Sequence, residues 1–83
     1  MGSEAQITAI FTEAQFRIEV SALLHRSVSR TRLWELRREL GSSEPLTYDH
    51  ARAIAFFAQL RRNRTDINAA REKTIAFCKE HGL

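Results

Sequence analysis

The chain has 83 residues, a net charge of +3 and an apolar share of 43%, which is the composition of one small folded domain. It has no apolar run long enough to span a membrane and no N-terminal basic segment followed by an apolar one. We therefore expect neither a membrane protein nor a secreted one. The single Cys excludes a disulfide within the chain and a cysteine-based zinc site, and we expect a cytoplasmic protein.

The first expected elements are a short strand at residues 7–11 and a helix from Thr12 to about His25. The strand is expected because Ile7-Thr8-Ala9-Ile10-Phe11 is short, β-branched and alternating. At the helix start, Thr12 is a suitable N-cap, and Gln15 three residues later completes a capping box. Apolar residues then recur every three to four positions and predict one buried face, formed by Phe16, Val20, Leu23 and Leu24.

A second helix is expected from Arg30 to Leu40, after an interruption at residues 27–29. Ser29 is a good N-cap for this helix, and Gly41 suits the position that closes it. Leucines at the same helical spacing predict the buried stripe, formed by Leu33, Leu36 and Leu40.

A turn and a second short strand are expected before the third helix. Residues 41–45 are rich in Gly, Ser and Pro, which are typical of a turn, and Leu46-Thr47-Tyr48 has the composition of a strand. Asp49 is then expected to cap a third helix, from about His50 to Arg62.

A fourth helix is expected to follow the polar break at residues 61–64. Thr65 or Asp66 caps it, and it runs to about His81 before Gly82 ends it. The chain is therefore predicted to be mainly α, with one domain at residues 1–63 and a separate C-terminal helix at residues 64–83.

The first two helices and the short turn between them have the spacing of a helix-turn-helix unit. The second helix of such a unit lies in the DNA major groove and presents its N-terminal residues to base edges. Here these residues are Ser29, Arg30, Thr31 and Arg32. Arg bonds guanine through two parallel hydrogen bonds, and Ser or Thr bonds phosphate or base.

The distribution of charge agrees with a DNA-binding helix. Residues 26–38 contain five Arg and one acidic residue, a net charge of +4 against +3 for the whole chain. Eleven of the 13 basic residues are Arg, whose planar fork matches phosphate and guanine. The alternative interpretation of the same stretch is an ordinary amphipathic helix with a solvated basic face.

Three short motifs between residues 7 and about 62 form a recognisable pattern. Val28-Ser29 is followed by Leu33 and an Arg-rich helix, then by Thr47-Tyr48-Asp49, and then by a helix that carries Arg52 and Ile54. This pattern resembles the MerR-type winged helix-turn-helix family. Two positions differ, since the family has a turn Gly and a wing Arg where this chain has Ser27 and Leu46.

The resemblance implies a small winged helix-turn-helix domain with a minimal two-strand wing, in which Ser29, Arg30, Arg32 and Tyr48 contact DNA. Family members dimerise through a long C-terminal helix that precedes an effector domain, whereas one helix follows here. That length is similar to effector-less members, including compact repressors found beside CRISPR-associated transposons. The resemblance therefore implies a nucleoid-associated homodimer that occupies an operator without a metal, cofactor or small-molecule effector.

The leading hypothesis is therefore a sequence-specific regulator of double-stranded DNA that is not an enzyme. Arg30, Thr31 and Arg32 are expected to contact bases or nearby phosphates. Contacts with the DNA backbone are expected from Ser29, Arg37, Thr47, Tyr48 and Arg52. The apolar stripe of the fourth helix is expected to form the dimer contact, through Ile67, Ala70, Thr74, Phe77 and Cys78, although a helix that folds back onto its own domain shows the same pattern.

Other kinds of site are less well supported by the sequence. His25, His50 and His81 lie on three different segments without ligand spacing, and Cys78 is expected to be a small core residue. Trp34 is expected at the edge of the core, with Arg38 stacked over its ring. The alternative functions are a small protein-interaction adaptor, such as an antitoxin-like or phage accessory module, and an excisionase-like protein that bends DNA.

Overall fold

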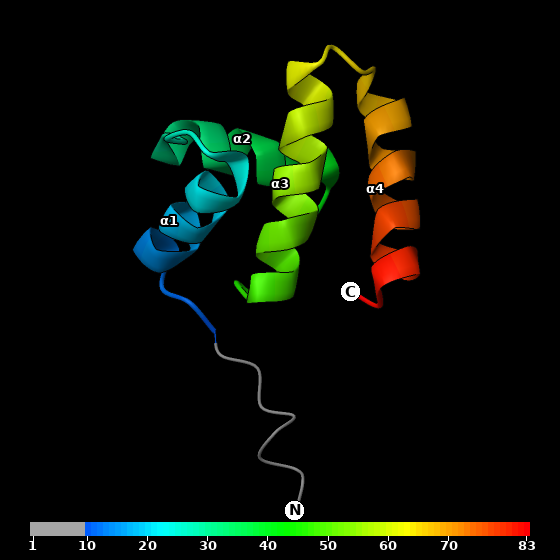
Figure 1. Ribbon diagram of the computed structural model, residues 1–83. Helices are drawn as coiled ribbons and strands as arrows, with labels where there is room; N and C mark the ends of the chain where they lie inside the picture. The colour runs from blue at the N-terminus through cyan, green and yellow to red at the C-terminus, as the bar shows by residue number, and fades with distance from the viewer. Residues whose placement is uncertain (1–9) are drawn as a thin grey trace, which may run out of the picture.

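The computed structural model describes residues 10–83, and these residues form four helices without a strand. The helices are α1 (Glu13–Leu24), α2 (Arg30–Leu40), α3 (Tyr48–Arg62) and α4 (Ile67–His81), shown in Figure 1. The predicted mainly α architecture is confirmed. Within the described range, no helix has the length and apolar content that crossing a membrane requires.

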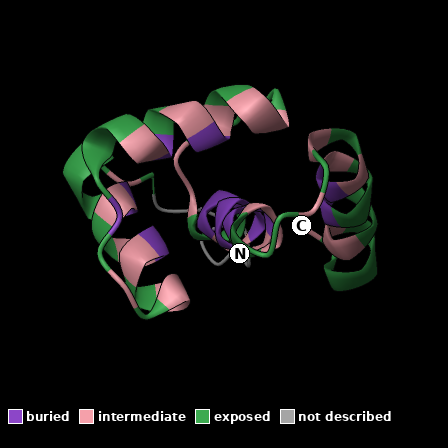
Figure 2. Cartoon of the chain, turned by 90° about the horizontal axis from the view of Figure 1, so that it is seen from above, coloured by how far each residue is buried: buried purple, intermediate pink, exposed green. Residues whose placement is uncertain are grey.

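The central element is α3, which packs against α1 and α2 on one side and against α4 on the other (Figure 2). Residues 51–58 contain four Ala and three large apolar residues, and seven residues of the helix are buried: His50, Ala51, Ala53, Ile54, Ala55, Phe57 and Ala58. A helix that is apolar on several faces needs cover on several faces. The small Ala side chains let the neighbouring helices approach it.

The predicted start of α1 is confirmed. The Thr12 hydroxyl accepts from the Gln15 N–H at 3.1 Å, and the Thr12 N–H donates to Gln15 Oε1 at 3.0 Å. The strand expected at residues 7–11 falls mostly on residues 7–9, which lie outside the described residues. Phe11 is not in a strand, but its N–H donates to the Leu46 carbonyl at 2.7 Å. This bond joins the segment before α1 to the segment before α3.

The second helix has the predicted bounds and caps. The Ser29 hydroxyl accepts from the Arg32 N–H at 3.1 Å, and Gly41 closes the helix with φ of 76°. That left-handed conformation is the one in which glycine avoids a steric penalty. Leu33 and Leu36 are buried, which anchors α2 against the rest of the domain.

The predicted strand at residues 46–48 is wrong, and the described residues contain no two-strand wing. Thr47 is the N-cap of α3, because its hydroxyl accepts from the His50 N–H at 3.2 Å, and Tyr48 is the first helical residue. Asp49, which was expected to be the cap, lies inside the first turn. A three-residue run with one hydrogen bond to Phe11 is too short for a stable strand, whereas a Thr hydroxyl satisfies a free helix N–H directly.

The fourth helix is capped by Asp66, one of the two residues predicted for that position, and it folds back along α3. The side chains expected to form a dimer contact face their own chain instead. Ala70 and Thr74 are buried, with 0% and 2% of their surface exposed, and the Phe77 ring stacks on Phe56 with centroids 4.2 Å apart. The Thr74 hydroxyl donates to the Ala70 carbonyl, so it is satisfied within α4. Of the pattern's two interpretations, packing within the chain is the one observed.

Candidate nucleic-acid interface

The N-terminal turn of α2 carries the exposed polar residues that the sequence singled out. Ser29, Arg30 and Thr31 are all exposed, and we call these three residues the α2 edge. On the opposite side of the same helix, Leu33 and Leu36 have 4% and 1% of their surface exposed. Because those leucines fix the helix in the core, the α2 edge is held outward by packing.

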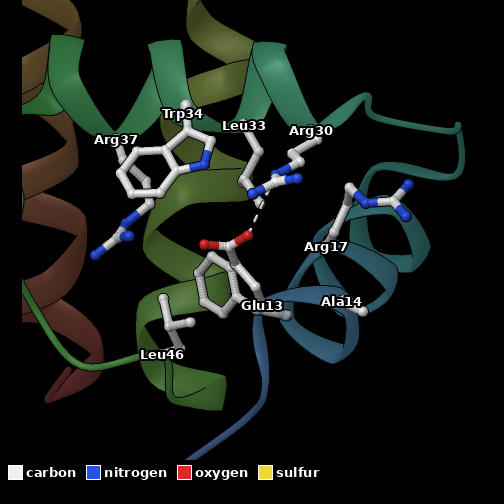
Figure 3. A pocket seen from close by; sticks show the side chains of 9 residues that line it. Glu13, Ala14, Arg17, Arg30, Leu33, Trp34, Arg37 and Leu46 are labelled. Atoms are coloured by element: carbon white, nitrogen blue, oxygen red, sulfur yellow. Dashed lines mark ion pairs between the residues drawn. The ribbon is translucent and has the colours of Figure 1, made fainter.

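Arg30 is the cation of the α2 edge, and it has an ion-pair partner. Its side chain is 76% exposed, and its Nε lies 3.3 Å from Glu13 Oε1 at the start of α1 (Figure 3). An ion pair this exposed is weak, since water and salt screen it. Arg30 can therefore exchange Glu13 for an external anion at little cost.

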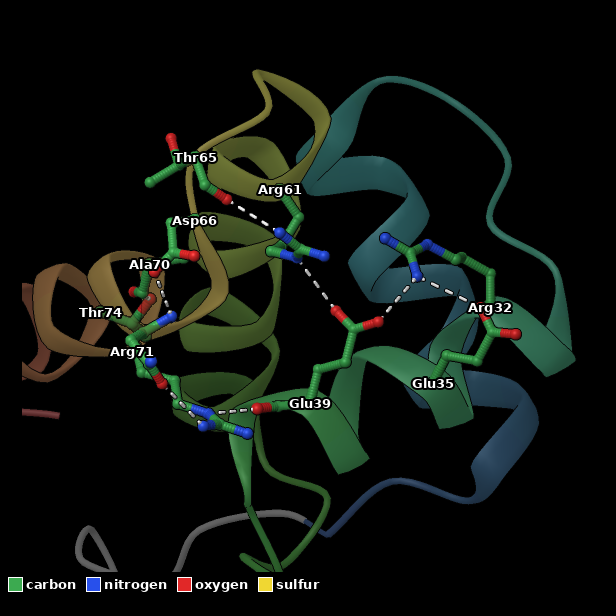
Figure 4. Close-up of polar contacts among 10 residues, drawn as sticks. Arg32, Glu35, Glu39, Arg61, Thr65, Asp66, Ala70, Arg71 and Thr74 are labelled. Carbon is green, nitrogen blue, oxygen red and sulfur yellow. Dashed lines mark hydrogen bonds and ion pairs between the residues drawn. The ribbon is translucent and has the colours of Figure 1, made fainter.

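Arg32 has a different environment from Arg30. Its Nη1 lies 3.2 Å from Glu35 Oε1 and 3.6 Å from Glu39 Oε2 on the same helix. Glu39 Oε1 also binds Arg61 Nε of α3 at 3.1 Å, and the Glu39 carbonyl accepts from the Arg71 guanidinium of α4 (Figure 4). The expected base contact by Arg32 would require its two ion pairs to break.

Two further arginines lie near this part of the fold, and sequence analysis did not select them as site residues. Burial lowers the pKa of Arg26, and the positive charges of Arg62 and Arg32 lower it further. Arg26 Nε is buried without a hydrogen-bond partner among the described residues. Arg26 and Arg62 are distant in the sequence, so only the packing of the α1–α2 turn against the end of α3 brings their charges together.

Three further predicted DNA contacts, Thr47, Tyr48 and Arg52, belong to α3 and its N-cap. Thr47 uses its hydroxyl as the α3 cap, and Tyr48 beside it is 45% exposed. The Arg52 guanidinium lies 5.9 Å from the centre of the Phe77 ring, so this side chain is directed toward α4. The structure therefore groups Ser29, Arg30 and Thr31, but it does not bring Arg52 into that group.

The arginine beside the Trp34 ring is Arg37, whereas Arg38 was expected to stack there. The Arg37 guanidinium lies 5.5 Å from the centre of the Trp34 ring, and its Nη2 donates to the Glu44 carbonyl at 3.1 Å. Arg38 is exposed. Residues three and four positions after Trp34 are both within its reach on a helix. Arg37 also bonds the Glu44 carbonyl in the loop after α2. Helical spacing does not predict this second bond.

Comparisons with known proteins identify no relative of this chain. No protein-family model matches it, and neither the curated proteins nor the solved structures contain a match. The interpretation of the site therefore depends on its own geometry and charge.

Proposed function

We propose that this protein is a sequence-specific regulator that binds double-stranded DNA through the N-terminal turn of α2. The observation that carries the proposal is the α2 edge itself, where three polar residues are exposed on a helix whose other side is anchored by Leu33 and Leu36. A helix end of this kind fits the major groove, where base edges differ in their donors and acceptors.

The proposed roles follow from exposure and hydrogen bonding. Arg30 leaves Glu13 and bonds a guanine, while Thr31 bonds a neighbouring base or phosphate. Arg38, exposed on the same helix, and Arg26, in the α1–α2 turn, add attraction to the phosphates without reading sequence. The role of Arg32 is to hold α2 in place through Glu39, which differs from its expected role as a base contact.

We further propose that two copies bind together and repress by occupying an operator, since two copies read two half-sites. The apolar stripe of α4 is used within the chain, so the contact between copies requires another surface. Ile75 of α4 is 55% exposed, which makes it the residue on which we place that contact.

Selection of bound sequences from a randomised duplex library, followed by variants, tests the DNA-binding proposal. Replacing Arg30 with Ala is expected to cost about 1–3 kcal/mol on the preferred duplex and to relax the preference at one base position. The matched control is Lys73→Ala, which removes one exposed positive charge from α4. If Arg30→Ala and Lys73→Ala bind the selected duplex equally well, the assignment of the α2 edge is contradicted.

A protein-interaction adaptor is the second candidate, because several large apolar side chains are exposed. Ile18 on α1 is 63% exposed, and Trp34 on α2 is 49% exposed. In this case the basic surface would meet an acidic protein. An adaptor binds DNA only weakly and without sequence preference, and that binding disappears at physiological salt.

A further inference from the structure

A groove of about 310 Å³ lies between the start of α1, one side of α2 and the loop before α3 (Figure 3). Its floor is apolar, formed by Phe16 and Leu33, with Leu46 at the side. Trp34 forms a wall and remains 49% exposed, which is unusual for the largest apolar side chain in a small domain. A flat apolar body can therefore replace water against this ring.

The rim of the groove is positively charged. Arg17, Arg30 and Arg37 line it together with one carboxylate, Glu13, which gives a local net charge of +2. Arg37 donates from Nη2 to the Glu44 carbonyl, which leaves other N–H groups of its guanidinium for a ligand, and this guanidinium lies 5.5 Å from the centre of the Trp34 ring. The groove thus combines an aromatic wall with donors that have spare capacity for an anion.

We propose that this groove binds a small aromatic anion, a flat apolar ring that carries a carboxylate or a phosphate. The ring lies against Trp34 over the apolar floor. The anionic group bonds Arg37 and Arg30, and it displaces Glu13 from Arg30. This binding is independent of the proposed function. Its consequence for DNA does rest on that function, because Arg30 belongs to both surfaces and a bound anion would compete with DNA for it.

The sequence supplies a direct reporter, since Trp34 is the only Trp in the chain. Titration of the protein with benzoate and with phenyl phosphate, in the absence of DNA, is expected to change the Trp34 fluorescence and its indole N–H resonance with saturation. Benzyl alcohol, which has the ring without the charge, is expected to bind at least about tenfold more weakly, because it forfeits the charge-assisted bonds.

Four variants separate this site from a general effect of positive charge. Arg37→Gln and Arg30→Gln are expected to weaken benzoate binding by about tenfold each, whereas Glu13→Gln is expected to strengthen it. Arg38→Gln is the matched control, because Arg38 is exposed on the same helix outside the groove, and it should leave binding unchanged. Arg37→Gln removes a bond to the loop after α2 and could disturb that loop. Arg30→Gln tests the site without this effect, because the Arg30 side chain is 76% exposed.

Three results would overturn the proposal. These are the absence of a saturable change with either anion, equal binding of benzyl alcohol, and a loss in Arg38→Gln as large as the loss in Arg30→Gln. Saturable binding to benzoate alone or to phenyl phosphate alone would support the site and identify which anionic group it accepts. Because DNA is absent from the titration, its outcome is separate from the outcome of the DNA-binding test.

Discussion

At the scale of single residues, His50 is a titratable group that folding buries. Its ring is 6% exposed, stacks on Phe16 with centroids 5.5 Å apart, and has Nε2 hydrogen-bonded to Ser42 Oγ at 3.1 Å. Burial and, to a smaller extent, the positive charge of Arg37 together lower the His50 pKa from 6.5 to about 4. The folded protein therefore holds this imidazole neutral.

This lowered pKa predicts a loss of stability in mild acid. Because the unfolded state takes up the proton first, the stabilisation is complete above pH 6.5 and is lost as pH falls through about 4. The loss is expected to reach about 3 kcal/mol. His50→Gln should show less of this pH dependence, measured by urea unfolding across the same range. An identical pH dependence in wild type and variant would show that other groups are responsible.

At the scale of helices, the sequence predicts caps well where the signal is local. Thr12, Ser29 and Asp66 each bond an N–H two or three residues away, so a short stretch of sequence contains both partners. The start of α3 was misplaced because Thr47 and Asp49 are both good cap residues two positions apart. The bond from Phe11 to Leu46, which comes from distant sequence, fixes the chain just before Thr47.

The corrected start of α3 gives a second prediction. Thr47→Ala is expected to lower the free energy of unfolding by about 1 kcal/mol, because it leaves the His50 N–H without its hydroxyl partner. Asp49→Ala is the matched control and should cost only a few tenths of a kcal/mol, since Asp49 acts through the helix dipole alone. Both losses are measured by thermal or urea unfolding. A larger loss for Asp49→Ala than for Thr47→Ala would show that Asp49 is the cap.

At the scale of the whole molecule, Glu39 joins three helices that sequence periodicity treats separately. Its carboxylate binds Arg32 of α2 and Arg61 of α3, and its carbonyl binds Arg71 of α4. The sequence indicated an Arg-rich helix but not which arginines had partners, because those partners are set by packing. For the same reason the α2 edge was predictable from one segment, whereas the groove beside Trp34 was not.

Replacing Glu39 tests this junction. Glu39→Gln removes both side-chain ion pairs and leaves the backbone bond to Arg71, so we expect a loss of about 1 kcal/mol in unfolding free energy, since the carboxylate is partly exposed. Glu35→Gln removes one pair within α2 and is expected to cost a few tenths of a kcal/mol. If urea unfolding shows equal losses for the two variants, Glu39 does not join the helices energetically.

The central claim is that the α2 edge reads DNA sequence, and the most direct measurement compares two duplexes at physiological salt. One is the duplex selected from a random library, and the other is its scrambled version of equal length. The account predicts a preference of at least about a thousandfold for the selected duplex, and a preference that persists as salt rises. Equal binding to both duplexes, lost as salt increases, would contradict the claim and reduce the arginines of α2 to a solvated basic surface.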